Sequence, residues 1–179
     1  MKIKMFQVDA FSSDLFSGNP AAVCLLNEWL SDELMLSIAS ENNLSETAFL
    51  NLSNDPIGIR WFSPKMEVDL CGHATLASAR VLLDQSKLKD SEKMVFESKR
   101  GLLRAQSEGD LIFLDFPSDN PQIINDNFSK NLFDYSPDRV IKGTDDYLFI
   151  FDHEEKIKTI NANYEEIIKL DSRGAIVSA

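Results

Sequence analysis

The 179-residue sequence has only two cysteines and two histidines. Two cysteines are too few for a disulfide framework, and these four residues lack the clustered spacing of a structural zinc site. Basic residues are also scarce, since 18 Lys and Arg stand against 29 Asp and Glu, for a formal net charge of −11. A surface that binds nucleic acid needs basic side chains to neutralise phosphates, so we expect no nucleic-acid partner.

Long apolar runs are absent as well. No segment approaches the roughly 18 uninterrupted apolar residues of a membrane span, so we expect no membrane partner. The first residues, MKIKMFQVDAF, lack the apolar run and small-residue cleavage site of a signal peptide. With so few cysteines, a reducing cytoplasm is the expected location. The composition, 44% hydrophobic and 26% charged, is typical of a globular protein.

Short alternating segments separated by Gly, Asn, Asp and Pro dominate the first 117 residues, which predicts strands joined by turns. One helix is expected to begin after Ser31, whose hydroxyl can accept a hydrogen bond from an early N–H group, and to end at Asn42 and Asn43. The predicted strands span residues 2–11, 21–26, 46–52, 57–62, 94–98, 102–107 and 111–116.

A second helix is predicted over residues 72–85. Its apolar side chains cover most of its circumference, which is typical of a buried helix. We therefore expect an α+β fold in which a strand-rich barrel surrounds this central helix, and we assign residues 1–117 to that first domain.

The sequence becomes more polar after Pro117, and residues 118–121 resemble a linker. Beyond it we predict strands at 139–142, 147–152, 156–159 and 174–179 and a helix at 164–170. Residues 118–179 are therefore expected to form a second domain that is only partly present, as in a truncated chain, because they contain no second buried helix.

Glu46 is the first candidate for chemistry. It begins a strand whose residues of the same face, Ala48 and Leu50, are apolar, so its carboxylate should point toward the core. Partial burial favours the protonated form of a carboxyl group, which suits a residue that both takes and returns a proton. The alternative is that Ser45 and Glu46 form a solvated turn.

The Cys71-Gly72-His73 segment at the start of the predicted central helix is the second candidate. A helix N-terminus presents free N–H groups and partial positive charge, and Gly72 allows a carboxylate to approach them closely. His73 is either a functional group or a capping or packing residue, and Cys71 is expected to be a small buried hydrophobe. Cys71 and His73 alone make a poor metal chelate, and Asp69 could cap the helix.

Three motifs carry a resemblance to a known family. They are FQVDAFSSDLFSGNPAAV at residues 6–23, ENNLSETAFL at 41–50 and IRWFSPKMEVDLCGHATLASA at 59–79. In this order and within about eighty residues, they resemble the PhzF-type phenazine-biosynthesis isomerase family, whose fold is that of diaminopimelate epimerase.

The resemblance implies a cofactor-independent isomerase that binds a small carboxylated substrate between two similar domains. Glu46 matches the family's proton-shuttling glutamate. Gly72 and His73 match residues that line the substrate site, while Ser45 and Asn19 fall at its margin. It implies no metal and no cofactor.

Length is the main departure from the family. Its members are longer, and their second domain supplies a catalytic aspartate and a second glycine-containing helix start. An alternative function is therefore a catalytically incomplete half-enzyme that acts as a small-carboxylate-binding or scaffold protein. A weaker alternative is a racemase that depends on Cys71. Exposed strand edges in an incomplete barrel lead us to expect a homodimer.

Overall fold

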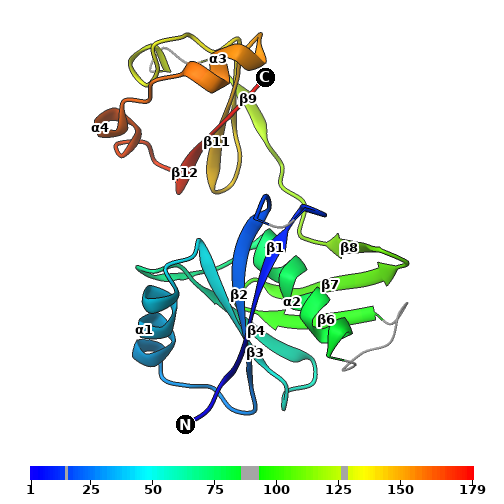
Figure 1. The fold of residues 1–179 in the computed structure, drawn as a ribbon. Helices are drawn as coiled ribbons and strands as arrows, with labels where there is room; N and C mark the ends of the chain where they lie inside the picture. Colours follow the sequence, from blue (N-terminus) through cyan, green and yellow to red (C-terminus); the bar gives the residue numbers. More distant parts are fainter. Residues whose placement is uncertain (15, 86–92, 126–128) are drawn as a thin grey trace. The chain divides into compact units, whose positions relative to one another are not determined.

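The computed structural model covers Met1–Ala179 and describes every residue except 15, 86–92 and 126–128 (Figure 1). Residue 15, which belongs to the first motif, therefore lies outside the described residues. The chain divides into two compact units, Met1–Pro117 and Ser118–Ala179. Within the described ranges, no helix is long and apolar enough to cross a membrane.

In its described residues the first unit consists of a curled sheet and two helices (Figure 1), and this half-barrel confirms the predicted α+β class. The strand order is β1-β2-β3-β4-β6-β7-β8, and the short β5 pairs with β4. Its elements are β1 (Lys4–Ala10), β2 (Asn19–Leu26), α1 (Asp32–Asn42), β3 (Glu46–Asn51), β4 (Ile57–Phe62), β5 (Glu67–Val68), α2 (Gly72–Asp84), β6 (Lys93–Ser98), β7 (Gly101–Glu108) and β8 (Leu111–Asp115).

The predicted hairpins are present, since β1 pairs with β2, β3 with β4, β6 with β7 and β7 with β8, all antiparallel. The parallel pairs β2–β3 and β4–β6 join these hairpins into one sheet. The β2–β3 register sets Ala21 opposite Glu46 and Val23 opposite Ala48. Because side chains alternate between the faces of a strand, this register fixes which β3 residues face α2.

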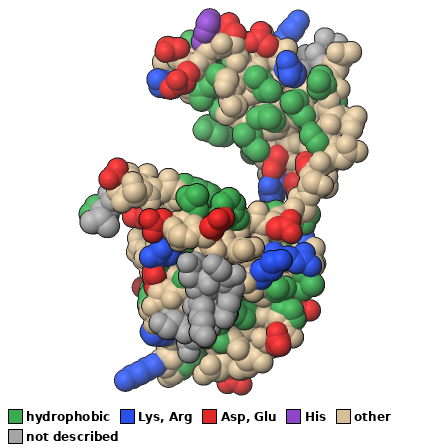
Figure 2. All heavy atoms as spheres, turned by 90° about the vertical axis from the view of Figure 1, so that its right-hand side faces the viewer, with side chains coloured by type: hydrophobic (Ala, Val, Ile, Leu, Met, Phe, Trp, Pro, Cys, Tyr) green, Lys and Arg blue, Asp and Glu red, His purple; other side chains and the backbone are tan. Residues whose placement is uncertain are grey.

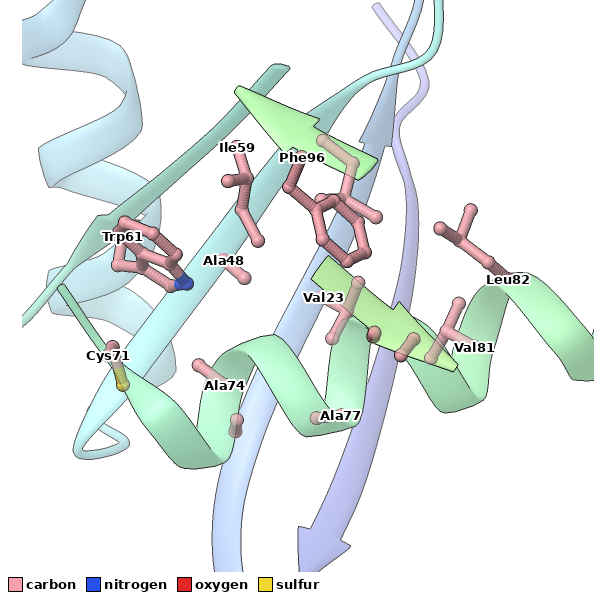
Figure 3. Close-up of a cluster of buried hydrophobic side chains, with 14 of the residues drawn as sticks. Val23, Ala48, Ile59, Trp61, Cys71, Ala74, Ala77, Val81, Leu82 and Phe96 are labelled. Atoms are coloured by element: carbon pink, nitrogen blue, oxygen red, sulfur yellow. The ribbon is translucent and has the colours of Figure 1, made fainter. Parts of the chain in front are cut away.

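Helix α2 packs into the concave side of the sheet, as its apolar composition predicted. Figure 3 shows side chains from several strands, among them Val23, Ala48 and Phe96, directed toward the helix. These three residues and Leu82 of α2 are fully buried in one cluster. Removing this apolar surface from water supplies the main stabilisation of the unit, at roughly 25 cal/mol per Å².

Helix α1 covers the opposite face of the sheet. The Ser31 hydroxyl accepts a hydrogen bond from the Leu34 N–H at 3.3 Å, and Asn43 ends the helix in the left-handed region with φ 50°, so both predicted caps are confirmed. Met35 and Ala39 of α1 pack with Phe49 of β3 in a second buried cluster.

The second unit has a four-stranded sheet of order β12-β11-β10-β9 around a small aromatic core that includes Phe133, Phe149 and Phe151. Strand β9 and the 3₁₀ segment η1 were missing from the prediction. The elements of the second unit are β9 (Gln122–Ile124), η1 (Ser129–Asn131), β10 (Arg139–Lys142), β11 (Asp146–Ile150), α3 (Glu154–Thr159), α4 (Tyr164–Ile167) and β12 (Gly174–Ser178).

The strand predicted at 156–159 is wrong, because this segment belongs to helix α3. Glu154 and Glu155 lie in its first turn, and basic residues lie in its last turn, which complements the helix dipole. A salt bridge of 2.8 Å between Lys158 Nζ and Glu154 Oε1 joins residues one helical turn apart. This charge pattern is typical of a short, solvent-exposed helix.

Figure 2 shows acidic and basic side chains interspersed over one face of the first unit, and hydrophobic side chains gathered on the visible face of the second. Large exposed hydrophobic residues of the second unit include Ile123 of β9 and Ile176 of β12, 69% and 50% exposed. Apolar surface of this unit therefore stays open to solvent.

Candidate functional site

Glu46 is held at the start of β3 by the core beneath it. Ala48 and Leu50, which share its face of the strand, are fully buried in the cluster around α2. The Glu46 side chain itself is 20% exposed, so it lies at the rim of that core rather than in bulk solvent. The strand prediction is correct, and the solvated-turn alternative does not describe Glu46.

The N-terminus of α2 carries no side-chain cap. Cys71 occupies the N-cap position without a capping hydrogen bond, and no acidic residue lies in the first turn. Asp69 is therefore not the helix cap that the sequence suggested, because the N-cap position falls two residues after it, at Cys71. The positive end of the helix dipole is left available to an anion.

Glu46, Cys71 and His73 meet at this helix start. Oε2 of Glu46 lies 3.3 Å from Nε2 of His73, and Sγ of Cys71 lies 3.4 Å from Nδ1 of the same ring. One ligand atom from each of the three residues falls within 4.8 Å of the others. The fold thus joins a carboxylate from β3 to a thiol and an imidazole from the start of α2.

Burial sets the protonation of the ring and the thiol. It lowers the pKa of His73 below its ordinary value of 6.5, although the Glu46 carboxylate and the Pro20 carbonyl pull in the opposite direction. Burial also raises the pKa of Cys71 to about 12. At neutral pH the site therefore contains a neutral imidazole and a protonated thiol.

The two marginal residues also lie together. The Ser45 hydroxyl donates a hydrogen bond to Oδ1 of Asn19 at 3.4 Å, which links the residue before β3 to the first residue of β2. The Pro20 carbonyl beside His73 was not anticipated, because a backbone group has no sequence signature. All five predicted site residues thus lie at the same ends of β2, β3 and α2.

Gly72 has room around it. A methyl group built on its Cα would come no nearer than 3.6 Å to Phe116, which is ordinary van der Waals contact. The packing of the first unit therefore does not require glycine at this position.

A separate groove of about 560 Å³ runs along another part of α2. Leu76 and Arg80 of the helix line it together with residues of β1 and β8. Neither Glu46 nor His73 lines this groove, so it is distinct from the site at the helix start.

Relatives of the chain carry isomerase names. A protein named as an uncharacterized isomerase from Halalkalibacterium halodurans is 42% identical over all of this chain and 68% of its own length. A protein from Pseudomonas aeruginosa, also named as an uncharacterized isomerase, is 43% identical over all of this chain and 69% of its own length. These similarities support an isomerase-type function for the chain.

Solved structures agree with the fold. A PhzF-family protein from Enterococcus faecalis superimposes with a TM-score of 0.87 at 36% identity, over 99% of this chain and 68% of that one. A hydroxyproline epimerase from Agrobacterium vitis, at 11% identity, has a TM-score of 0.52 over 84% of this chain and 51% of that one. At this identity the similarity shows only that the two chains share an epimerase-like fold.

The sequence profile of the family described as phenazine biosynthesis-like protein matches residues 8–179. The three motifs that suggested this resemblance lie almost entirely within that match. The chain therefore belongs to the PhzF-type phenazine biosynthesis-like family.

Proposed function

We propose that the chain is a cofactor-independent isomerase in which Glu46 transfers a proton between carbon atoms of a small carboxylated substrate. The contact between Glu46 and His73 at the uncapped start of α2 carries this proposal, because it sets a carboxylate base beside an anion-binding helix end. The isomerase names of the relatives agree with a reaction of this type.

The substrate carboxylate would accept hydrogen bonds from the N–H groups around Gly72. Glu46 would then remove a proton from carbon as the C–H electron pair moves into an adjacent π system. The same carboxyl group would return the proton to another carbon, so that no proton is lost overall. Neutral His73 can hold the protonated Glu46 in place by accepting a hydrogen bond at Nε2.

The test is deuterium incorporation in D₂O. A panel of cyclic and amino-acid-like carboxylates is incubated with the protein and followed by ¹H NMR for loss of carbon-bound protons. We expect the Glu46→Gln variant to abolish exchange, since an amide cannot take up the proton. Glu41→Gln, at an exposed position on α1, is the matched control and should exchange at the wild-type rate. A Glu46→Gln protein that exchanges at full rate would eliminate the proposed role.

The alternative function, a carboxylate-binding protein without turnover, gives a different result in the same experiment. The chain spans 68–69% of the length of its two bacterial relatives, which is why this alternative is tested. Carboxylates that shift the amide resonances of α2 without exchanging their protons would favour it. Sedimentation over a range of concentrations tests the proposed homodimer.

A further inference from the structure

The Glu46, Cys71 and His73 cluster has a second property that proton transfer does not use. A thiol, an imidazole and a carboxylate are the three ligand types that zinc prefers, and zinc sites with three protein ligands leave one position open. Among the described residues, these three form the one group of this composition whose ligand atoms gather within 4.8 Å. They come from two different elements, which the sheet register brings together.

The three side chains lie close enough to share a cation once the His73 ring turns. Two ligands bound to one tetrahedral zinc ion at about 2.0–2.3 Å are roughly 3.3–3.6 Å apart. The observed Glu46–His73 and Cys71–His73 separations are 3.3 and 3.4 Å. Because these contacts use different nitrogens of the ring, His73 must turn about its Cβ–Cγ bond so that one nitrogen meets the cation.

The environment of His73 favours binding of such a cation. The His73 side chain is only 10% exposed, and its buried Nε2 lies 3.3 Å from Glu46 Oε2 but makes no hydrogen bond in the described part of the chain. Cys71 is a free cysteine, so its sulfur is not consumed by a disulfide. A buried polar atom without a partner is costly, and a bound cation would satisfy it.

We propose that Glu46, Cys71 and His73 bind a thiophilic divalent cation of the zinc class, and that the bound cation blocks proton transfer by Glu46. On binding, the Cys71 S–H bond breaks, the proton passes to solvent and the sulfur electron pair bonds to the cation, with no change of oxidation state. The blocking half rests on the proposed function, whereas the binding half stands independently.

Cobalt(II) is the probe for binding, because its thiolate complexes absorb in the near ultraviolet and its tetrahedral complexes absorb in the visible. We expect one Co²⁺ per chain with both bands, and loss of the near-ultraviolet band in Cys71→Ser. Cys24→Ser is the matched control, since Cys24 is the other free, buried cysteine and lies in the cluster under α1. Glu46→Gln should keep the sulfur band but bind at least about 10- to 100-fold more weakly, the loss seen even for indirect partners of a metal.

The outcomes separate the two proposals. A sulfur band that survives Cys71→Ser, or no Co²⁺ binding by the wild type, overturns the site. If Co²⁺ binding gives both bands and the metal-free protein shows no carbon-bound proton exchange, the result supports the site and contradicts the proposed isomerase function. Where exchange is observed, Zn²⁺ at saturation should stop it and a chelator should restore it. Full-rate exchange with the site saturated overturns the blocking role.

Discussion

Replacing Gly72 by alanine separates the binding role of the α2 start from its structural role. A Cβ atom at this position would meet nothing closer than 3.6 Å, and Gly72 has no positive φ that would strain alanine. Gly→Ala substitutions at compatible positions stabilise a protein by about 0.4–1 kcal/mol, because the unfolded chain loses freedom. The folded protein should therefore be as stable as the wild type or slightly more stable.

Binding should respond in the opposite direction. We expect the added methyl group to obstruct a carboxylate that approaches the N–H groups of Gly72 and His73. A hydrogen bond to a charged group contributes about 1.5–3 kcal/mol, so losing one weakens binding by roughly 10- to 150-fold. Stability and affinity would thus change with opposite signs, which a general packing defect cannot produce.

The assay is a ¹H–¹⁵N NMR titration with benzoate, a small cyclic carboxylate, alongside thermal unfolding. In the wild type we expect the amide signals of residues 72–74 to shift most. Gly174→Ala is the control, since its Cβ would also make only an ordinary contact, 3.5 Å from Asp146, in the second unit. An unchanged benzoate affinity in Gly72→Ala would refute the view that this helix start holds the carboxylate.

Three further predictions concern stability. Ser31→Ala removes the hydroxyl that caps α1 and should lower the free energy of unfolding by about 1 kcal/mol in urea, whereas an unchanged midpoint would contradict the cap. Leu82→Ala in the α2 core should cost about 2–5 kcal/mol, against less than about 0.5 kcal/mol for the 64% exposed Leu111→Ala. Arg60 donates two hydrogen bonds of 2.7 Å to Glu67, which lowers the Glu67 pKa below its ordinary value of 4.5. That stabilisation is present above pH 4.5 and is lost as the pH falls through the folded pKa, so the urea-midpoint gap between wild type and Arg60→Met should narrow in acid; a pH-independent gap would contradict it.

The first unit was largely predictable because its signals are local. Alternating segments with turn residues between them predict hairpins, and an all-apolar helix predicts a core. The parallel pairing of β2 with β3 was not predictable in this way, since it joins strands separated by α1. The same limit applies to the cluster of Glu46, Cys71 and His73. Cys71 and His73 are neighbours in the sequence, whereas Glu46 is brought to them by the long-range pairing of β3.

The segments whose conformation was predicted wrongly, or not predicted at all, are short. Residues 156–159 alternate as a strand does, and only the spacing of Glu154 and Lys158 favours the helix. Strand β9 has three residues and exists because β10 offers it an edge. In such segments the intrinsic pattern is weak, and the neighbouring structure decides the conformation.

The register of β3 links stability to chemistry in this fold. Glu46 points toward the start of α2 because Ala48 and Leu50 on the same face must enter the core. A one-residue slip would turn those apolar side chains out and carry the Glu46 carboxylate to the face covered by α1. The apolar residues that hold the strand in place therefore also aim the carboxylate. The contact with His73 is thus protected by the burial energy of the core rather than by its own weak attraction.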